Sequence, residues 1–153
     1  MALPERAVRA ERTGWRDQEI SARHRVWGFN CPAVDLDFLM VEYNLGKPVG
    51  LIEYKHHQAW EPNLKHPTYR ALTELAELAA LPFLIAFYWP DVWAFRITPV
   101  NGLAQSHFQD GEILTERAFV TRLYRMRALV IRDAVLLQLN DELPVDPFAG
   151  LVF

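Results

Sequence analysis

Two apolar segments separated by a short turn-like stretch constrain the fold of this chain most strongly. Val34 to Tyr43 and Val49 to His56 are mostly apolar, and Asn44-Leu45-Gly46-Lys47-Pro48 lies between them. Turn-forming residues between two such runs are typical of a β-hairpin. The sequence therefore predicts two neighbouring strands in its first half.

The rest of the chain alternates between helical and strand patterns. The predicted helices are Trp15–Trp27, Thr68–Ala80 and Thr115–Asn140, and the further predicted strands are Phe83–Trp89 and Val92–Thr98. The resulting α-β-β-α-β-β-α order predicts an α/β fold, in which helices flank a mixed central sheet.

Length and the last helix bear on the organisation of the chain. Its 153 residues fit a single domain, residues 1–153, with a flexible N-terminal segment at about residues 1–12. The long C-terminal helix, about residues 115–140, is apolar on two sides, whereas a helix that only covers a sheet needs one apolar stripe. We therefore expect it to contact a second subunit as well, in a homodimer.

Acidic and basic residues lie within the predicted hairpin. Alternate side chains of a strand share a face, so Asp35 and Asp37 lie on one face of their strand, and Glu53 and Lys55 on one face of theirs. A three-residue loop sets Asp37 opposite Glu53, and a five-residue loop keeps the faces while shifting the pairing by two residues. A four-residue loop would put Asp37 and Glu53 on opposite faces.

Two carboxylates in directly opposed positions repel each other unless a cation lies between them. Mg²⁺ is suited to this position because it prefers oxygen ligands and keeps waters and a substrate phosphate in its remaining positions. Lys55 is then placed to orient an attacking water or to stabilise developing negative charge. The alternative is a structural ion pair between these acids and Lys55 at the end of a sheet.

The hairpin sequence, Val34-Asp-Leu-Asp-Phe-Leu-Met-Val-Glu-Tyr followed by Gly50-Leu-Ile-Glu-Tyr-Lys55, resembles the PD-(D/E)XK nuclease superfamily. The compact layout is most similar to the archaeal-type Holliday junction resolvases, which phages also carry. The resemblance implies a restriction-endonuclease-like core and Mg²⁺-dependent hydrolysis of DNA, with Mn²⁺ as a substitute. It also implies a homodimer that nicks a four-way junction symmetrically.

The resemblance assigns the catalytic role to Asp37, Glu53 and Lys55, with Glu19 of the preceding helix as a further acid near the metal. Asp37, Glu53 and Glu19 are the implied metal ligands. Two departures leave alternatives open. Ala33-Val34-Asp35 replaces the Pro-Asp of the superfamily, so Asp35 competes with Asp37, and the stretch between Glu19 and Asp37 is short.

Net charge is −3, so any DNA contact must come from local basic groups. Arg16, Arg23 and Arg25 belong to an arginine-rich N-terminal stretch and are the predicted phosphate contacts. The alternative for Arg23 is an i,i+4 pair with Glu19 on a solvated helix. Trp60, in the predicted loop of residues 57–66, has two readings: a base-stacking residue or, as we favour, a core anchor.

Cys31 is the only cysteine and the N-terminus lacks an apolar export signal. We therefore expect a cytoplasmic setting, which for a phage-borne enzyme is the host cytoplasm. Two other functions remain open: the same site acting on flaps, single strands or duplex DNA, and a non-catalytic dimeric module with a structural ion-pair network.

Overall fold

The computed structural model describes residues 18–28 and 32–146. The chain divides into two compact units, residues 1–35 and residues 36–153, and each is described by itself. The segment 1–12, Arg16 and Cys31 lie outside the described residues. Within the described part, no helix is long and apolar enough to cross a membrane.

In the first unit, the described residues form helix α1 (Gln18–Val26), within the predicted helix. The backbone N–H of Trp27 still donates to the carbonyl of Arg23, and Gly28 then adopts a φ of 82°. A positive φ is the conformation in which glycine commonly ends a helix, so the predicted stop at Gly28 is confirmed.

The second unit is built on a five-stranded mixed sheet in the order β1-β2-β3-β4-β5. Its strands are β1 (Phe38–Glu42), β2 (Lys47–His56), β3 (Phe83–Trp89), β4 (Ala94–Pro99) and β5 (Ile113–Leu114). The strands β2 and β3 are parallel and the other neighbours are antiparallel. The predicted α/β class with a mixed sheet is therefore confirmed.

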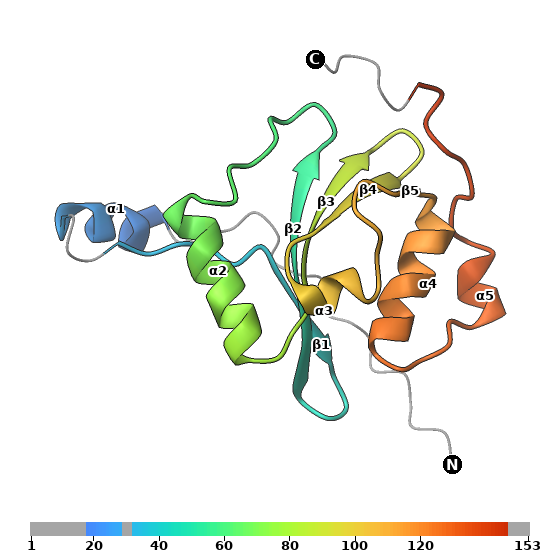
Figure 1. Ribbon diagram of the computed structural model, residues 1–153, viewed down its shortest axis with the longest axis horizontal. Coiled ribbons are helices and arrows are strands. Elements are labelled where there is room, and N and C mark those ends of the chain that lie inside the picture. Colours follow the sequence, from blue (N-terminus) through green and yellow to red (C-terminus); the bar gives the residue numbers. More distant parts are fainter. Residues whose placement is uncertain (1–17, 29–31, 147–153) are drawn as a thin grey trace. The chain divides into compact units, whose positions relative to one another are not determined.

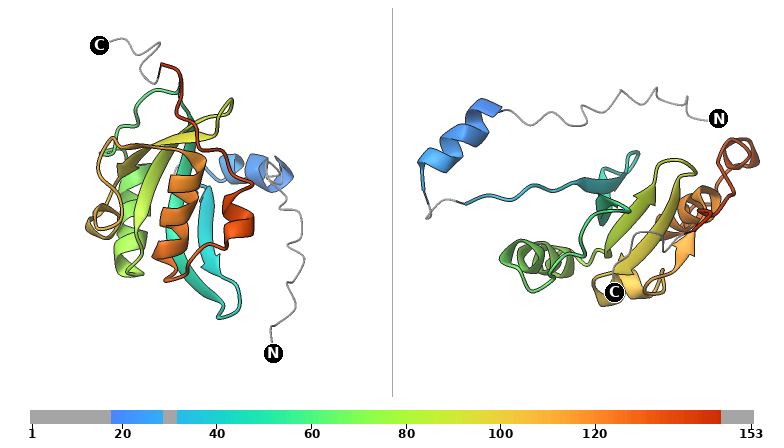
Figure 2. Two further views of the ribbon diagram at one scale, coloured as in Figure 1. Left: turned by 90° about the vertical axis from the view of Figure 1, so that its right-hand side faces the viewer. Right: turned by 90° about the horizontal axis from the view of Figure 1, so that it is seen from above.

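Two helices cover opposite faces of the sheet, as Figures 1 and 2 show. They are α2 (Pro67–Leu78), which connects the parallel strands β2 and β3, and α4 (Glu116–Met126). Leu51 of β2 belongs to the cluster under α2, whereas its neighbour Ile52 belongs to the cluster under α4. This alternation is the two-residue period of a strand buried on both faces.

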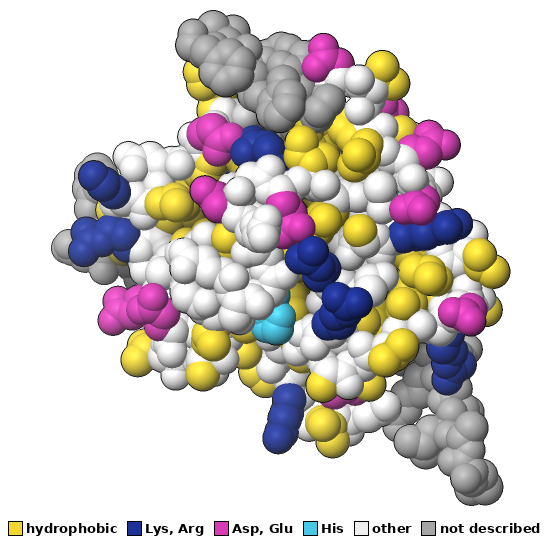
Figure 3. Space-filling view, turned by 45° about the vertical axis from the view of Figure 1, so that its right-hand side comes forward, with side chains coloured by type: hydrophobic (Ala, Val, Ile, Leu, Met, Phe, Trp, Pro, Cys, Tyr) yellow, Lys and Arg dark blue, Asp and Glu magenta, His cyan; other side chains and the backbone are white. Residues whose placement is uncertain are grey.

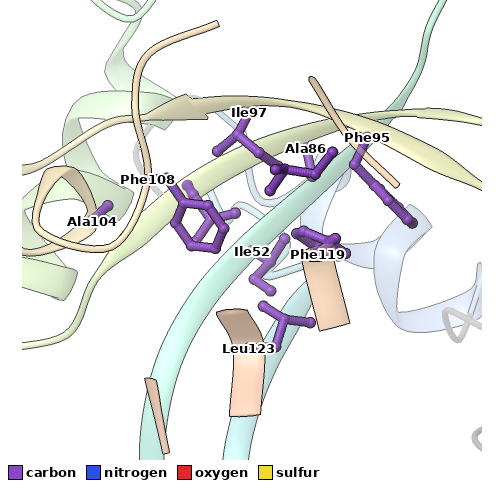
Figure 4. Close-up of a cluster of buried hydrophobic side chains, with 10 residues drawn as sticks. Ile52, Ala86, Phe95, Ile97, Ala104, Phe108, Phe119 and Leu123 are labelled. Atoms are coloured by element: carbon purple, nitrogen blue, oxygen red, sulfur yellow. The ribbon is translucent and has the colours of Figure 1, made fainter. Parts of the chain in front are cut away.

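The larger core lies between the sheet and α4, and Figure 4 shows its side chains converging from both. Phe95 of β4 stacks on Phe119 of α4 with ring centroids 4.1 Å apart. Strand β3 passes through the middle, and its residues Leu84 and Ala86 are fully buried. Burial of each large side chain contributes about 1.5–3 kcal/mol, so this layer holds the fold together.

The predicted helix over residues 115–140 is wrong, because α4 ends at Met126. Ala128 has a left-handed φ of 54°, and the backbone N–H of Leu129 donates to the carbonyl of Tyr124, which closes the helix end. The short helix α5 (Asp133–Leu136) follows separately. A left-handed alanine has no sequence signature. The apolar pattern of residues 115–140 therefore gave no sign that the helix breaks at Ala128.

Two smaller predictions also need correction. The predicted strand of residues 34–43 shortens to β1, and residues 32–37 before it lie outside any strand. The predicted loop of residues 101–111 contains a short helix, α3 (Gly102–Gln105). Buried Asn101 caps this helix and also accepts from the backbone N–H of Phe83, so one side chain fixes α3 against β3.

Candidate active site

The hairpin turn has four residues, Tyr43 to Gly46, between the paired residues Glu42 and Lys47. The turn therefore matches neither the three-residue loop nor the five-residue loop predicted from the sequence. A β-bulge corrects the phase, because Val41 pairs with Pro48 while Met40 pairs with Gly50, which leaves Val49 as an extra residue.

The bulge restores the alignment that a four-residue turn alone would remove. Beyond it, Phe38 pairs with Ile52. Continuing this antiparallel register by one residue sets Asp37, which directly precedes β1, across from Glu53. The expectation that a four-residue turn separates these two acids onto opposite faces is therefore wrong, because the bulge adds the missing residue.

Glu53 and Lys55 lie side by side on the face of β2 that α2 covers. The Lys55 Nζ is 3.2 Å from the Glu53 Oε1, and the two side chains are 25% and 19% exposed. Both charges are thus shielded from bulk water yet reachable from it. A pair in this setting interacts more strongly than a pair on the open surface.

Tyr69, in the first turn of α2, completes this group. Its hydroxyl donates a 2.8 Å hydrogen bond to the Glu53 Oε1, and its ring centroid is 6.0 Å from the Lys55 Nζ. Sequence reasoning missed Tyr69. The sequence feature that could have identified Tyr69 is its spacing from Leu72 and Ala76. This spacing extends the buried stripe of α2 by one turn toward the end of β2.

The contacts within this group change two pKa values. Burial works to lower the pKa of Lys55, but hydrogen bonding to Tyr69 and to Glu53, with the negative charge of Glu53, raises it above its usual value. Burial and the hydrogen bond to Glu53 raise the pKa of Tyr69. At neutral pH Lys55 is therefore an ammonium ion and Tyr69 a neutral phenol.

The carboxylates of Asp37 and Glu53 are the candidate ligands of a metal ion. In the described residues, no group of three or more His, Cys, Asp or Glu side chains is arranged to hold a metal. Mg²⁺ is commonly bound by one or two carboxylates and keeps several waters, so two residues such as Asp37 and Glu53 can be enough for it. A structural zinc site needs four protein ligands, and these two residues do not provide them. The oxygen-only chemistry of this pair fits Mg²⁺.

The other residues predicted to act at the site belong to the first unit. Glu19 lies in the first turn of α1, and Arg23 and Arg25 lie in its last turn. Asp35 is the last residue of that unit. The structure brings together Glu53 and Lys55. The metal roles of Asp37 and Glu19 and the phosphate roles of Arg23 and Arg25 stay predictions.

Three arginines of the C-terminal third form ion pairs within the protein. Figure 3 shows Lys and Arg side chains lying between apolar ones, with acidic side chains near several of them. The pairs are Arg117 with Asp141 at 3.8 Å, Arg122 with Glu112 at 3.1 Å and Arg127 with Glu42 at 2.7 Å. Because these guanidinium groups already bind carboxylates of the protein, they are less available to bind the phosphates of DNA.

Comparisons of the chain with protein-family profiles, with curated proteins and with solved structures found no match.

Proposed function

We propose that this protein is a Mg²⁺-dependent endodeoxyribonuclease of the PD-(D/E)XK type that hydrolyses phosphodiesters at branched DNA. The observation that carries the proposal is the pairing of Phe38 with Ile52, next to the Glu53–Lys55 pair; continued by one residue, this register sets Asp37 across from Glu53. Acidic residues within apolar strands are costly to retain without a use. The order of hairpin, α2 and parallel strand β3 is compatible with a restriction-endonuclease-like core.

Asp37 and Glu53 would hold the Mg²⁺, which supplies charge neutralisation at the phosphate and makes a bound water more acidic. The protein contributes the positions of its own groups. Lys55 remains an ammonium at the reaction pH because its pKa is raised, so it donates hydrogen bonds to a phosphate oxygen or orients a water. Tyr69 and Lys55 both contact the Glu53 Oε1, which fixes the rotation of that carboxylate.

The proposed substrate is a four-way junction, and the proposed assembly is a homodimer. A junction has two equivalent strands to cut, so symmetric nicking needs two copies of the site related by twofold symmetry. Flaps, single strands and duplex DNA are the alternative substrates, because one reaction centre serves many DNA shapes.

The test incubates the protein with Mg²⁺ and labelled four-way junction, flap, single-stranded and duplex DNA. We expect paired nicks in the junction, reduced about a hundredfold or more in Glu53→Gln and in Lys55→Ala. Glu74→Gln, on the exposed face of α2, is the matched control and should cut like the unchanged protein. Junction cutting that survives Glu53→Gln would remove this site from the reaction.

A non-catalytic role is the second candidate, and the contacts of Glu53 favour it specifically. Its Oε1 already receives Lys55 and Tyr69, as in a structural ion-pair network. In that case Mg²⁺ would not raise the melting temperature. The nuclease proposal predicts the opposite, because an ion that binds only the folded state stabilises it. This Mg²⁺-induced rise should be absent in Asp37→Asn.

A further inference from the structure

Arg96 of β4 lies in one cross-strand row with Lys55 of β2. Lys55 pairs with Phe87, and Phe87 pairs with Arg96. Phe95 and Ile97, on either side of Arg96, belong to the core under α4, so Arg96 is on the other face of the sheet, the face of Lys55. Strands β2, β3 and β4 lie side by side in Figure 1. With neighbouring strands about 4.8 Å apart, the backbones of Lys55 and Arg96 are about 10 Å apart.

The Arg96 guanidinium is directed along this row toward β2. Its Cζ lies 4.1 Å from the centroid of the Phe87 ring, and Phe87 stands between Arg96 and Lys55 in the row. Phe87 is fully buried, so its ring is a fixed support. A guanidinium that stacks on a ring still offers N–H groups at its edges. Arg96 therefore holds a positive charge in a defined place, one strand away from Lys55.

Glu61 neutralises this charge from the loop between β2 and α2. Its Oε1 accepts a 2.5 Å hydrogen bond from an Nη of Arg96. The two side chains differ in exposure, because Arg96 is 16% exposed and Glu61 is 61% exposed. In the Arg122–Glu112 pair the acid is 17% exposed. An exposed carboxylate gives up an ion pair at little cost, since water takes the place of the cation. Arg96 is thus a fixed cation with a replaceable partner.

The loop around Glu61 is open to solvent. Residues 58–61 are all exposed. Trp60 is almost wholly exposed, so the expectation that it anchors the core is wrong. The contact with Arg96 joins Glu61 to the sheet. Movement of the Glu61 side chain away from Arg96 would therefore expose no buried core.

We propose that Arg96 is a further phosphate-binding residue of the proposed site, and that a phosphate of the bound DNA strand takes the place of Glu61 on its guanidinium. A phosphodiester and a carboxylate both offer a guanidinium a pair of oxygens to bind. The inference rests on the proposed function, which supplies DNA as the ligand. It adds a contact that holds the strand at a phosphate near the one that Lys55 faces.

The test measures binding of a labelled four-way junction to the full chain in EDTA, by fluorescence anisotropy over a range of salt concentrations. Arg96→Gln should weaken binding about tenfold and lower the slope of log affinity against log salt by about one, because one phosphate contact is lost. Arg96→Lys keeps the charge and should keep most of the slope. Unchanged affinity and slope in Arg96→Gln, or no binding by the unchanged protein, would overturn the proposal.

Glu61→Gln should have the opposite effect. We expect binding to tighten about two- to fivefold, because the phosphate no longer competes with a carboxylate for Arg96. Loss of folding cannot produce a gain in affinity, so this variant tests the proposal even where Arg96→Gln folds poorly. If Glu61 only anchors the loop, its replacement would leave the affinity unchanged or lower it, and either result would overturn the proposal.

Two variants control for charge and for stacking. Arg122 lies over the ring of Phe108 and has a carboxylate partner, as Arg96 does, but it belongs to α4, on the other side of the sheet. Arg122→Gln should leave the salt slope unchanged. Glu74→Gln, on the exposed face of α2, removes one negative charge and should not tighten binding. Equal effects of the Arg96 and Arg122 variants would show that net charge and not a contact is measured, which would overturn the proposal.

Cleavage with Mg²⁺ separates the two proposals. If the unchanged protein cuts no DNA while Arg96→Gln lowers the salt slope, the nuclease function fails and the Arg96 contact stands. If the unchanged protein cuts the junction and Arg96→Gln binds it with the same affinity and slope, the Arg96 contact fails and the nuclease function stands. Where both hold, Arg96→Gln should raise KM with kcat nearly unchanged, whereas Lys55→Ala lowers kcat.

Discussion

Tyr69 joins a helix to the acidic residue of the proposed site through one hydroxyl. Its 2.8 Å hydrogen bond reaches the same Glu53 oxygen that Lys55 contacts. A residue placed in this way acts on the carboxylate and not on a substrate. We therefore regard Tyr69 as a positioning residue of the proposed nuclease site.

Replacing Tyr69 with phenylalanine tests this role. Removal of the hydroxyl should lower kcat about tenfold with little change in KM, because the carboxylate loses its fixed rotation while the DNA contacts remain. Stability should fall by about 0.5–1.5 kcal/mol, as for a typical hydrogen bond. Single-turnover cleavage and urea unfolding measure the two effects, with Tyr124→Phe on α4 as control. A change in KM alone would contradict a positioning role.

Individual residues also show which features could be predicted from the sequence and which could not. Glu53 and Lys55 were found because their spacing in a strand dictates a shared face. Tyr69 was missed because the crossing of α2 over β2 is a tertiary feature. Trp60 was expected to anchor the core but is 94% exposed, in a loop whose Glu61 pairs with Arg96, a residue far away in sequence.

At the scale of elements, continuous apolar runs were easier to interpret than mixed ones. Strand β3 matches its prediction from Phe83 to Trp89, since a run of this length between Pro82 and Pro90 has few alternatives. The long C-terminal helix failed because its break is set by the backbone at Ala128. Local propensity alone carries no sign of such a break.

Replacing Ala128 with glycine should stabilise the protein. The left-handed conformation of an L-residue costs about 1–2 kcal/mol, and Ala128 is exposed, so little packing is lost with its methyl group. We expect a gain of about 0.5–1 kcal/mol in the free energy of unfolding, measured in urea. A loss of stability would show that the turn after α4 is held by more than its backbone.

The Glu42–Arg127 pair connects β1 to the end of α4 and should weaken in acid. The hydrogen bond from Arg127 lowers the pKa of Glu42 against the opposing effect of burial, aided by the backbone N–H of Asn44. A lowered pKa contributes stability above the unfolded value of 4.5, and that stability is lost as pH falls through the folded value.

Glu42→Gln should therefore lose less stability than the unchanged protein between about pH 5 and pH 3. Urea unfolding across this range measures the difference, and Glu74→Gln, which lacks such a partner, should follow the unchanged protein. Parallel pH dependences of Glu42→Gln and the unchanged protein would mean that the pair does not couple to folding.

At the scale of the whole molecule, apolar side chains remain exposed beyond α4. Val130 is 91% exposed and Leu137 is 71% exposed, although both belong to the apolar stripe from which a second subunit was expected. Beyond the break in the helix, Val130 and Leu137 are separate exposed side chains. A homodimer through these groups stays a prediction, because it is contiguous apolar patches that favour association.

The double change Val130→Asp with Leu137→Asp should shift a dimer to monomers. Light scattering over a range of concentrations measures the mass, and circular dichroism checks the fold. We expect the monomeric variant to lose paired nicks in a four-way junction while it stays folded. A dimer that persists in this variant would place the interface elsewhere.

Because of the extra residue at Val49, the positions of Glu53 and Lys55 do not depend on the length of the hairpin turn. Glu53 and Lys55 are aligned by the pairing of β2 with β3, where Glu53 faces Ile85 and Lys55 faces Phe87. Changes in turn length are thus absorbed before they reach these residues. The tip at Leu45 and Gly46 is accordingly a suitable insertion point for an affinity tag or a fluorophore that leaves Glu53 and Lys55 in place.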